Sequence, residues 1–295
     1  MLRNTFQKVQ ASLSLKRNLK NPKGKQNRSG NLYFSKHWSL HISTHLVIPD
    51  PHAHPDHNND RADLLAKLII DLKPDVVINI GDQFDLSSLS GYDKGKRSFV
   101  GRSYRADIDA GLEFSDRLWG PVKKTKKRLP LRIFFEGNHE HRIERALDLS
   151  PEMEGTIGFA DLELDNWYDE IVRYDGSTPG IREVDGIFYA HYFISGVMGR
   201  PLGGEHPAYS LYSKLGRSCT AGHLHTLDYC VRTSVDGRKN NNLVAGCFFD
   251  YNSDWAGKAN DLYWRGVIIK RNVENGEYNP QFVSIDELKK TYASS

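Results

Sequence analysis

The sequence predicts an α/β fold in which two β-sheets pack as a sandwich and helices flank them. Two observations point to this class. Residues 42–135 alternate apolar, strand-like runs with amphipathic helical patterns, as parallel strands connected by helices do. Residues 187–283 contain mostly short strand-like runs, enough for a second sheet. At 295 residues the chain is long enough to bury a core of this size.

The first 36 residues are predicted to form a basic, flexible arm, and residues 37–295 the folded domain. Residues 1–49 contain nine Lys or Arg and no Asp or Glu, so 31 basic residues (40 − 9) face 37 acidic ones in the remainder. Such an arm is attracted to phosphates, which makes nucleic acid a candidate partner. An organelle-targeting segment, contact with an anionic membrane and a solvated tail are the alternatives.

In the first half of the domain, strands are expected at 42–48, 76–80 and 131–135. Asp60 is expected to cap a helix with an apolar face from Leu64 to Leu72, which Pro74 ends. A second helix is predicted over 104–119. Strands that alternate with helices pair in parallel, so their carboxyl ends should meet at one edge of the sheet.

The second half is predicted to be mostly strands. They are expected at 187–190, 218–221, 229–233, 243–248, 267–270 and 281–283, with a helix at 285–292. The turn-rich stretch 235–242 is expected to connect a hairpin. The Gly-rich segment 196–207 is predicted to be a mobile loop near the edge that carries the strand ends.

Five polar clusters follow predicted strands, and their chemistry suits metal ions. They are Asp50-Pro51-His52, Gly81-Asp82-Gln83-Phe84-Asp85, Gly137-Asn138-His139-Glu140, His191 and Gly222-His223-Leu224-His225. Each cluster alone is also compatible with an ordinary turn, but their order and common placement favour one shared site. Carboxylate, amide and imidazole donors without thiolate suit Mn, Fe or Zn better than Ca, and the set is large enough for two divalent ions.

This order of motifs (DxH, GDxxD, GNH[DE], a lone His, GHxH) resembles the calcineurin-like metallophosphoesterase superfamily over roughly residues 42–250. The resemblance implies a metallo-dependent phosphatase type of fold with two bound metal ions. It implies one metal held by Asp50, His52 and His225, a second held by Asn138, His191 and His223, and Asp82 bridging both. It also implies that His139 protonates the leaving group or contacts the phosphate, and that Asp85 orients His139. Glu140 occupies the Asp-or-Glu position of the third motif.

Three arginines are candidate substrate-binding residues. Arg97 and Arg102 lie in a basic stretch, 92–105, that also carries aromatic residues, and Arg142 follows His139 closely. Cations bind phosphates and aromatic rings stack on bases, so stretch 92–105 is a candidate substrate loop. An exposed loop without a binding role is the alternative.

The predicted activity is hydrolysis of a phosphomonoester or phosphodiester by metal-activated water, with nucleotide or nucleic acid substrates favoured. The sequence has neither a G-x-S-x-G elbow nor a P-loop, so no protein nucleophile is expected. The alternatives are a DNA or RNA nuclease of the same superfamily and a non-catalytic scaffold with this fold.

The composition predicts a cytoplasmic protein without a membrane span. The three cysteines do not form a CxxC motif, no apolar run approaches about 18 residues, and a secretory signal pattern is absent. The sequence gives no sign of an obligatory protein partner.

Overall fold

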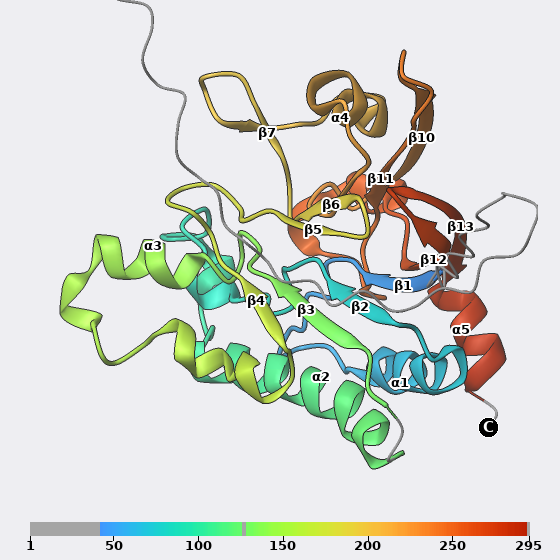
Figure 1. The fold of residues 1–295 in the computed structure, drawn as a ribbon. Coiled ribbons are helices and arrows are strands. Elements are labelled where there is room, and N and C mark those ends of the chain that lie inside the picture. The colour runs from blue at the N-terminus through green and yellow to red at the C-terminus, as the bar shows by residue number, and fades with distance from the viewer. Residues whose placement is uncertain (1–41, 126–127, 294–295) are drawn as a thin grey trace, which may run out of the picture. The chain divides into compact units, whose positions relative to one another are not determined.

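The computed structural model describes residues 42–125 and 128–293, so the predicted arm at residues 1–36 lies outside the described residues. The described part contains two main sheets flanked by helices, which confirms the predicted fold class (Figure 1). The strands and helices that carry the five polar clusters are all present in it.

The first sheet has six strands in the order β13-β12-β1-β2-β3-β4. Its parallel strands are β1 (Ser43–Ile48), β2 (Val76–Asn79), β3 (Leu131–Phe135) and β4 (Glu170–Val172). The antiparallel strands at the other side are β12 (Gly266–Glu274) and β13 (Glu277–Ser284). The parallel pairing places the carboxyl ends of β1, β2 and β3 at one edge, as the sequence predicted.

The second sheet has five strands in the order β10-β11-β9-β6-β5. Their bounds are β5 (Arg182–Val184), β6 (Ile187–Ala190), β9 (Cys219–Ala221), β10 (Leu227–Thr233) and β11 (Lys239–Ala245). The three central strands, β11, β9 and β6, are parallel, and the edge strands are antiparallel to their neighbours. A separate short hairpin pairs β7 (Ile194–Ser195) with β8 (Arg200–Pro201).

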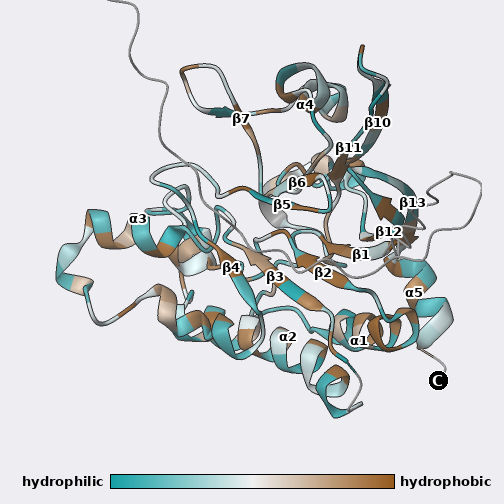
Figure 2. Ribbon diagram, in the orientation of Figure 1, coloured by the Kyte–Doolittle hydropathy of each residue, from teal (hydrophilic) through white to brown (hydrophobic). Residues whose placement is uncertain are grey.

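Helices lie outside the sandwich (Figure 1). The α-helices are α1 (Asp60–Leu72), α2 (Tyr104–Lys124), α3 (Arg142–Leu149), α4 (Pro207–Leu215) and α5 (Ile285–Tyr292). Short 3₁₀ helices span η1 (Ser87–Leu89), η2 (Arg97–Phe99), η3 (Pro151–Met153), η4 (Phe159–Leu162), η5 (Leu164–Asn166) and η6 (Asp254–Leu262). Figure 2 shows hydrophobic residues along α1 and along the strands that it covers.

The alternation of side chains along β1 explains how one strand serves two cores. Leu46 and Ile48 pack in the layer formed with α1, α2 and α5. Val47, which points the other way, packs in the layer between the sheets with Ile187 and Leu243. A strand buried on both faces is apolar throughout, and this is why the sequence pattern located it.

Two helix boundaries differ from the prediction. Asp60 is the first residue of α1 rather than its cap, and the preceding Asn59 instead donates from its side chain to the carbonyl of Ala110 (3.0 Å). Helix α2 continues past residue 119 to Lys124 although it contains Pro121. Burial of Val122 against the core supports this last turn, so packing outweighs the local effect of proline.

Several elements, or parts of elements, were not predicted because their sequences are polar or short. Strand β11 begins at Lys239, four residues earlier than expected, and buries Asn240, Asn241 and Asn242. The Asn241 side chain donates to the Tyr229 hydroxyl (2.7 Å), so cross-strand contacts replace the missing apolar pattern. The expected loop at 196–207 contains strand β8 and the first residue of α4. Helix α3 and strands β4 and β5 were also missed.

Candidate metal centre

The predicted metal ligands lie where strands of the two sheets end. In the first sheet, Asp50 and His52 follow β1, Asp82 follows β2 and Asn138 follows β3. In the second sheet, His191 follows β6, and the pair His223 and His225 follows β9. The structure brings six of these side chains into two groups whose donor atoms lie within 4.8 Å of one another, namely Asp50, His52 and His225, and Asp82, His191 and His223.

In the first group, three donor atoms face one another. His225 Nε2 lies 3.2 Å from His52 Nε2 and 3.2 Å from Asp50 Oδ2. The other carboxylate oxygen of Asp50 is buried and has no hydrogen-bond partner. Nitrogen and oxygen lone pairs that share a buried space are unfavourable unless a cation lies among them. This donor set therefore fits a divalent metal ion.

In the second group, the orientation of His191 fits a metal ligand. Its Nδ1 donates to the carbonyl of Ile80 (2.9 Å), so Nε2 faces Asn138 Oδ1 at 2.9 Å and Asp82 Oδ2 at 3.2 Å. A backbone carbonyl on one ring nitrogen commonly fixes the other as a ligand. Burial lowers the pKa of His191, but the Asp82 carboxylate outweighs it and raises that pKa to about 9. The surroundings of His191 therefore stabilise a positive charge at this point of the site.

The carboxylate of Asp82 belongs to the second group and also faces the first. Its Oδ2 is 3.2 Å from His191 Nε2 and 3.9 Å from the Nε2 atoms of both His52 and His139. Its Oδ1 accepts from the backbone N–H of His139 (2.8 Å). Burial raises the pKa of Asp82, but His191 and His139 hold it well below its usual range. An ionised oxygen therefore faces donor atoms of both sheets.

His139 is held by contacts on both ring nitrogens. Its Nδ1 donates to the backbone carbonyl of Asp85 (2.6 Å), and its Nε2 lies 3.0 Å from Arg142 Nη2. The Asp85 carboxylate is 3.4 Å from His139 Nδ1 but only 3.0 Å from His52 Nδ1. Asp85 therefore contacts two histidines, with its carboxylate nearer to His52. Burial and the Arg142 guanidinium lower the pKa of His139.

The other two predicted substrate arginines are placed differently from Arg142. Arg102 donates to the Asp93 carboxylate (2.8 Å) and to the Ser87 carbonyl (2.8 Å), so its guanidinium stabilises its own loop. Arg97 is exposed in η2. Among the three, Arg142 is the one that contacts a predicted catalytic residue.

Glu140 has a structural role that the sequence alone did not reveal. Its carboxylate is fully buried and accepts from the backbone N–H groups of Asp82, Phe84 and Gly137, each at 2.9 Å. Burial and the nearby Asp82 charge raise the pKa of Glu140 to about 8. One side chain thus ties the loop after β2 to the loop after β3, and it positions Asp82.

Backbone strain is concentrated at this site. Five predicted ligands have positive φ angles although none is glycine: Asp50 (37°), His52 (43°), Asp82 (53°), His223 (69°) and His225 (60°). Conformations of this kind cost on the order of 1–3 kcal/mol each and persist where the surroundings enforce them. Strain repeated at five ligands is what a preorganised functional site shows.

Two glycines allow the loops to approach the carboxylates. A Cβ atom on Gly137 would lie 2.2 Å from Asp82 Oδ1, and one on Gly222 would lie 2.2 Å from Asp50 Oδ1. Both separations are far below van der Waals contact, so any side chain at either position would displace a predicted ligand.

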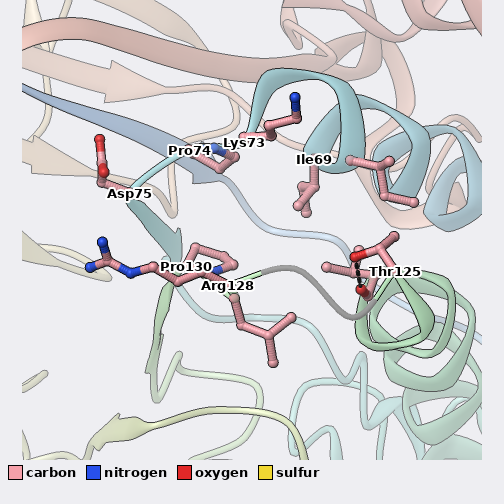
Figure 3. A pocket seen from close by; sticks show the side chains of 10 residues that line it. Ile69, Lys73, Pro74, Asp75, Thr125, Arg128 and Pro130 are labelled. Carbon is pink, nitrogen blue, oxygen red and sulfur yellow. Dashed lines mark hydrogen bonds between the residues drawn. The ribbon is translucent and has the colours of Figure 1, made fainter.

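A different pocket lies at the opposite end of the strands (Figure 3). It has a volume of about 270 Å³ and is lined partly by Lys73 and Pro74, just before β2, and by Pro130, just before β3. None of the predicted site residues lines it. Because ligands of such sheets bind beyond the carboxyl ends of the strands, this pocket is separate from the candidate centre.

Comparison with known proteins agrees with this geometry. A model of the calcineurin-like phosphoesterase family matches residues 44–244. A search of curated protein sequences finds no match. Among solved structures, a conserved uncharacterized protein from Streptococcus pneumoniae TIGR4, described as a predicted phosphoesterase, is 13% identical, covers 83% of this chain and 90% of its own, and has a TM-score of 0.34. A second structure is 10% identical, covers 82% of this chain and 99% of its own, and has the same TM-score of 0.34. These two similarities are too weak to support further conclusions.

The fold and the site define a metal-dependent hydrolase of ester bonds. The family model matches more than half of this chain, so the chain belongs to the calcineurin-like phosphoesterase family. Within the described residues, no helix is both long and apolar enough to cross a membrane.

Proposed function

We propose that this phosphoesterase holds two divalent metal ions and hydrolyses esters of nucleotides or nucleic acids. The observation that carries the two-metal assignment is the position of Asp82 Oδ2, which faces imidazole nitrogens from both groups of donors. A carboxylate so placed is suited to bridge two cations. Mn, Fe and Zn all suit this mixture of oxygen and nitrogen donors.

In this proposal, one metal is bound by Asp50, His52 and His225, the other by Asn138, His191 and His223, and Asp82 binds both. When bound, such a pair lowers the pKa of water and neutralises charge on the phosphoryl oxygens. The backbone carbonyls and carboxylates behind the histidines orient their rings toward the ions, as the Ile80 carbonyl does for His191.

His139 is the proposed acid for the leaving group. The carbonyl of Asp85 accepts the proton on Nδ1, and Nε2 accepts from Arg142, so Nε2 is the ring atom that would take up a proton and pass it to the leaving group once the guanidinium turns to the substrate. Arg142 Nη2 donates toward that nitrogen at 3.0 Å, and its side chain is half-buried. Its guanidinium is therefore placed to bind a phosphoryl oxygen that enters beside His139.

A substrate panel tests the proposal. Metal-free protein is loaded separately with Mn, Fe or Zn and assayed against p-nitrophenyl phosphate, bis-p-nitrophenyl phosphate, nucleotides and oligonucleotides. Hydrolysis that depends on metal and is faster for nucleoside-containing esters is expected. Equal rates for esters without a nucleoside would overturn the substrate class. Absence of turnover with every metal would favour the non-catalytic scaffold.

A nuclease of the same family is the second proposal, and it depends on the basic residues 1–36. A nucleic-acid-binding arm raises affinity in a salt-dependent way. If the proposal holds, deleting residues 1–36 weakens cleavage of DNA or RNA and flattens its salt dependence, while hydrolysis of bis-p-nitrophenyl phosphate is unchanged. Unchanged cleavage of nucleic acid would remove the arm from the function.

A further inference from the structure

A pocket of about 610 Å³ opens beside the second group of donors. Asn138 and Tyr192 line it, and Asn138 Oδ1 is 2.9 Å from His191 Nε2. Its volume is within the range of small-molecule sites, about 300–1,000 Å³. Besides these two residues, its wall includes Glu136, His141, Glu144, Arg145, Arg173 and Tyr174.

One wall of this pocket is a pair of stacked rings fixed from behind. His141 and Tyr174 stack with centroids 4.1 Å apart and planes 12° apart. The Glu136 carboxylate, only 1% exposed, accepts from His141 Nδ1 (3.1 Å), Arg173 Nε (2.7 Å) and the backbone N–H of Tyr174 (2.8 Å). Two of these contacts, from the His141 ring and the backbone of Tyr174, hold the stacked pair in place, so this aromatic surface is preorganised.

Tyr192 connects the aromatic wall to the metal centre. Its ring centroid lies 4.8 Å from that of His223, and its hydroxyl lies 3.4 Å from the hydroxyl of Tyr174. The rings of Tyr174 and Tyr192 are 6.4 Å apart and nearly perpendicular, at 81°. A group attached to a phosphate at the donor atoms would therefore meet the Tyr192 ring beside His223, with the Tyr174 ring next to it.

The rest of the wall offers both hydrogen-bond donors and acceptors. Arg145 donates to the backbone carbonyl of Asn138 (3.0 Å), which leaves further N–H groups of its guanidinium for a ligand. The carboxylates of Glu144 and Asp148 supply acceptors. An acyl chain would gain little from such charged walls, whereas a base presents a stacking face and an edge with donors and acceptors.

We propose that this pocket binds the nucleoside part of the phosphoester, with the base against the His141–Tyr174 stack. The inference rests on the proposed function, because it places the phosphate at the donor groups. It adds a named subsite and assigns a binding role to four residues outside the metal motifs, namely His141, Arg145, Tyr174 and Tyr192.

The first test compares two substrates with the same leaving group, thymidine 5′-(p-nitrophenyl phosphate) and methyl p-nitrophenyl phosphate. Tyr174→Ala is expected to raise KM for the thymidine ester about tenfold relative to the methyl ester, in line with the loss of a base-stacking contact. Tyr174→Phe retains the ring and should restore the wild-type ratio. Tyr209→Ala, at a 47% exposed tyrosine on α4, is the matched control and should leave the ratio unchanged. An unchanged ratio in Tyr174→Ala would overturn the subsite.

The second test measures binding without metal, so that it does not depend on turnover. Thymidine 5′-monophosphate is titrated into metal-free protein and followed by NMR, with thermal melting to verify that each variant is folded. About tenfold weaker binding in Tyr174→Ala than in Tyr174→Phe supports the subsite even if the enzyme fails to hydrolyse either ester. Equal binding by both folded variants, or stronger binding of glucose 1-phosphate than of the nucleotide, overturns it. Turnover of both esters with equal KM values contradicts the subsite while leaving phosphoester hydrolysis intact.

Discussion

Two regions of this molecule bury titratable side chains, and they are organised in opposite ways. Between the sheets, donors meet acceptors: Lys270 Nζ donates to the Tyr189 hydroxyl (3.2 Å), that hydroxyl contacts His45 Nδ1 (2.8 Å), and His45 Nε2 contacts Asp185 (2.9 Å). At the candidate metal centre, the donor-type atoms His52 Nε2, His225 Nε2 and Asp50 Oδ2 crowd together, and Asp50 Oδ1 has no hydrogen-bond partner. Burial of polar groups is common to both regions. Crowded metal-ligating atoms, an unpartnered carboxylate oxygen and backbone strain distinguish the site that could hold metal ions.

The largest effect that would sharpen this contrast is expected for Asp82→Asn. Loss of its charge between the two groups should lower kcat/KM by about 10³-fold, the upper end for removing one preorganised electrostatic group. Metal content measured by mass spectrometry should fall as well. Asp56→Asn is the control, since its carboxylate is 83% exposed in the loop that follows His52. Activity within tenfold of wild type would show that Asp82 does not bridge metals.

His139→Gln should lower kcat by at least about 10²-fold, the usual contribution of a general acid. Metal content should stay at the wild-type level, because the proposed role of His139 is proton transfer. His54→Gln removes an imidazole from the loop after β1 that belongs to neither group of candidate donors, and it should have little effect. Loss of metal in His139→Gln would instead make this residue a ligand.

Asp85→Asn tests which histidine its carboxylate supports. Because the carboxylate is nearer to His52 than to His139, metal affinity should fall about tenfold, the lower end for a group behind a ligand. At saturating metal, kcat should recover to near the wild-type value. A fall in kcat that excess metal does not rescue would favour the role implied by the family resemblance, in which Asp85 acts through His139.

The smallest effect is expected in the region between the sheets. Burial holds the pKa of Lys270 well below its usual value, so with rising pH the amine loses its proton earlier in the folded state than in the unfolded state. The unfolded state then binds the extra proton, and the free energy of unfolding of the wild type rises with pH from the lowered pKa up to about pH 10.4. Lys270→Met removes this dependence and should stabilise the fold at neutral pH by about 1 kcal/mol.

Urea unfolding at several pH values measures the change in Lys270→Met. Lys239→Met is the control, since this lysine is 60% exposed and should keep the wild-type pH dependence. Phosphoesterase activity should be unchanged in the Lys270 variant. A steep pH dependence of the free energy of unfolding that survives in Lys270→Met would assign the titration to another buried group. Loss of phosphoesterase activity in this variant would show that the region between the sheets also supports the site.

The sequence by itself determined the strands that are apolar on both faces and the motifs at their ends. Both signals are local: the run Val76 to Asn79 is recognisable without its neighbours, and each polar motif directly follows its strand. The family and the edge of the sheet where the site forms followed from these signals. Segments without such a pattern, such as the first half of β11 with its three buried asparagines, were not located.

Tertiary structure decided which side chains touch. The contacts of Glu140 with the loop after β2, the nearness of Asp85 to His52, and the pocket between Tyr174 and Tyr192 all join segments distant in the chain or in different elements. No local pattern encodes such contacts, because they depend on the packing and register of two whole sheets. The sequence thus determined the kind of chemistry at this edge, and the packed fold determined the geometry of the residues that carry it.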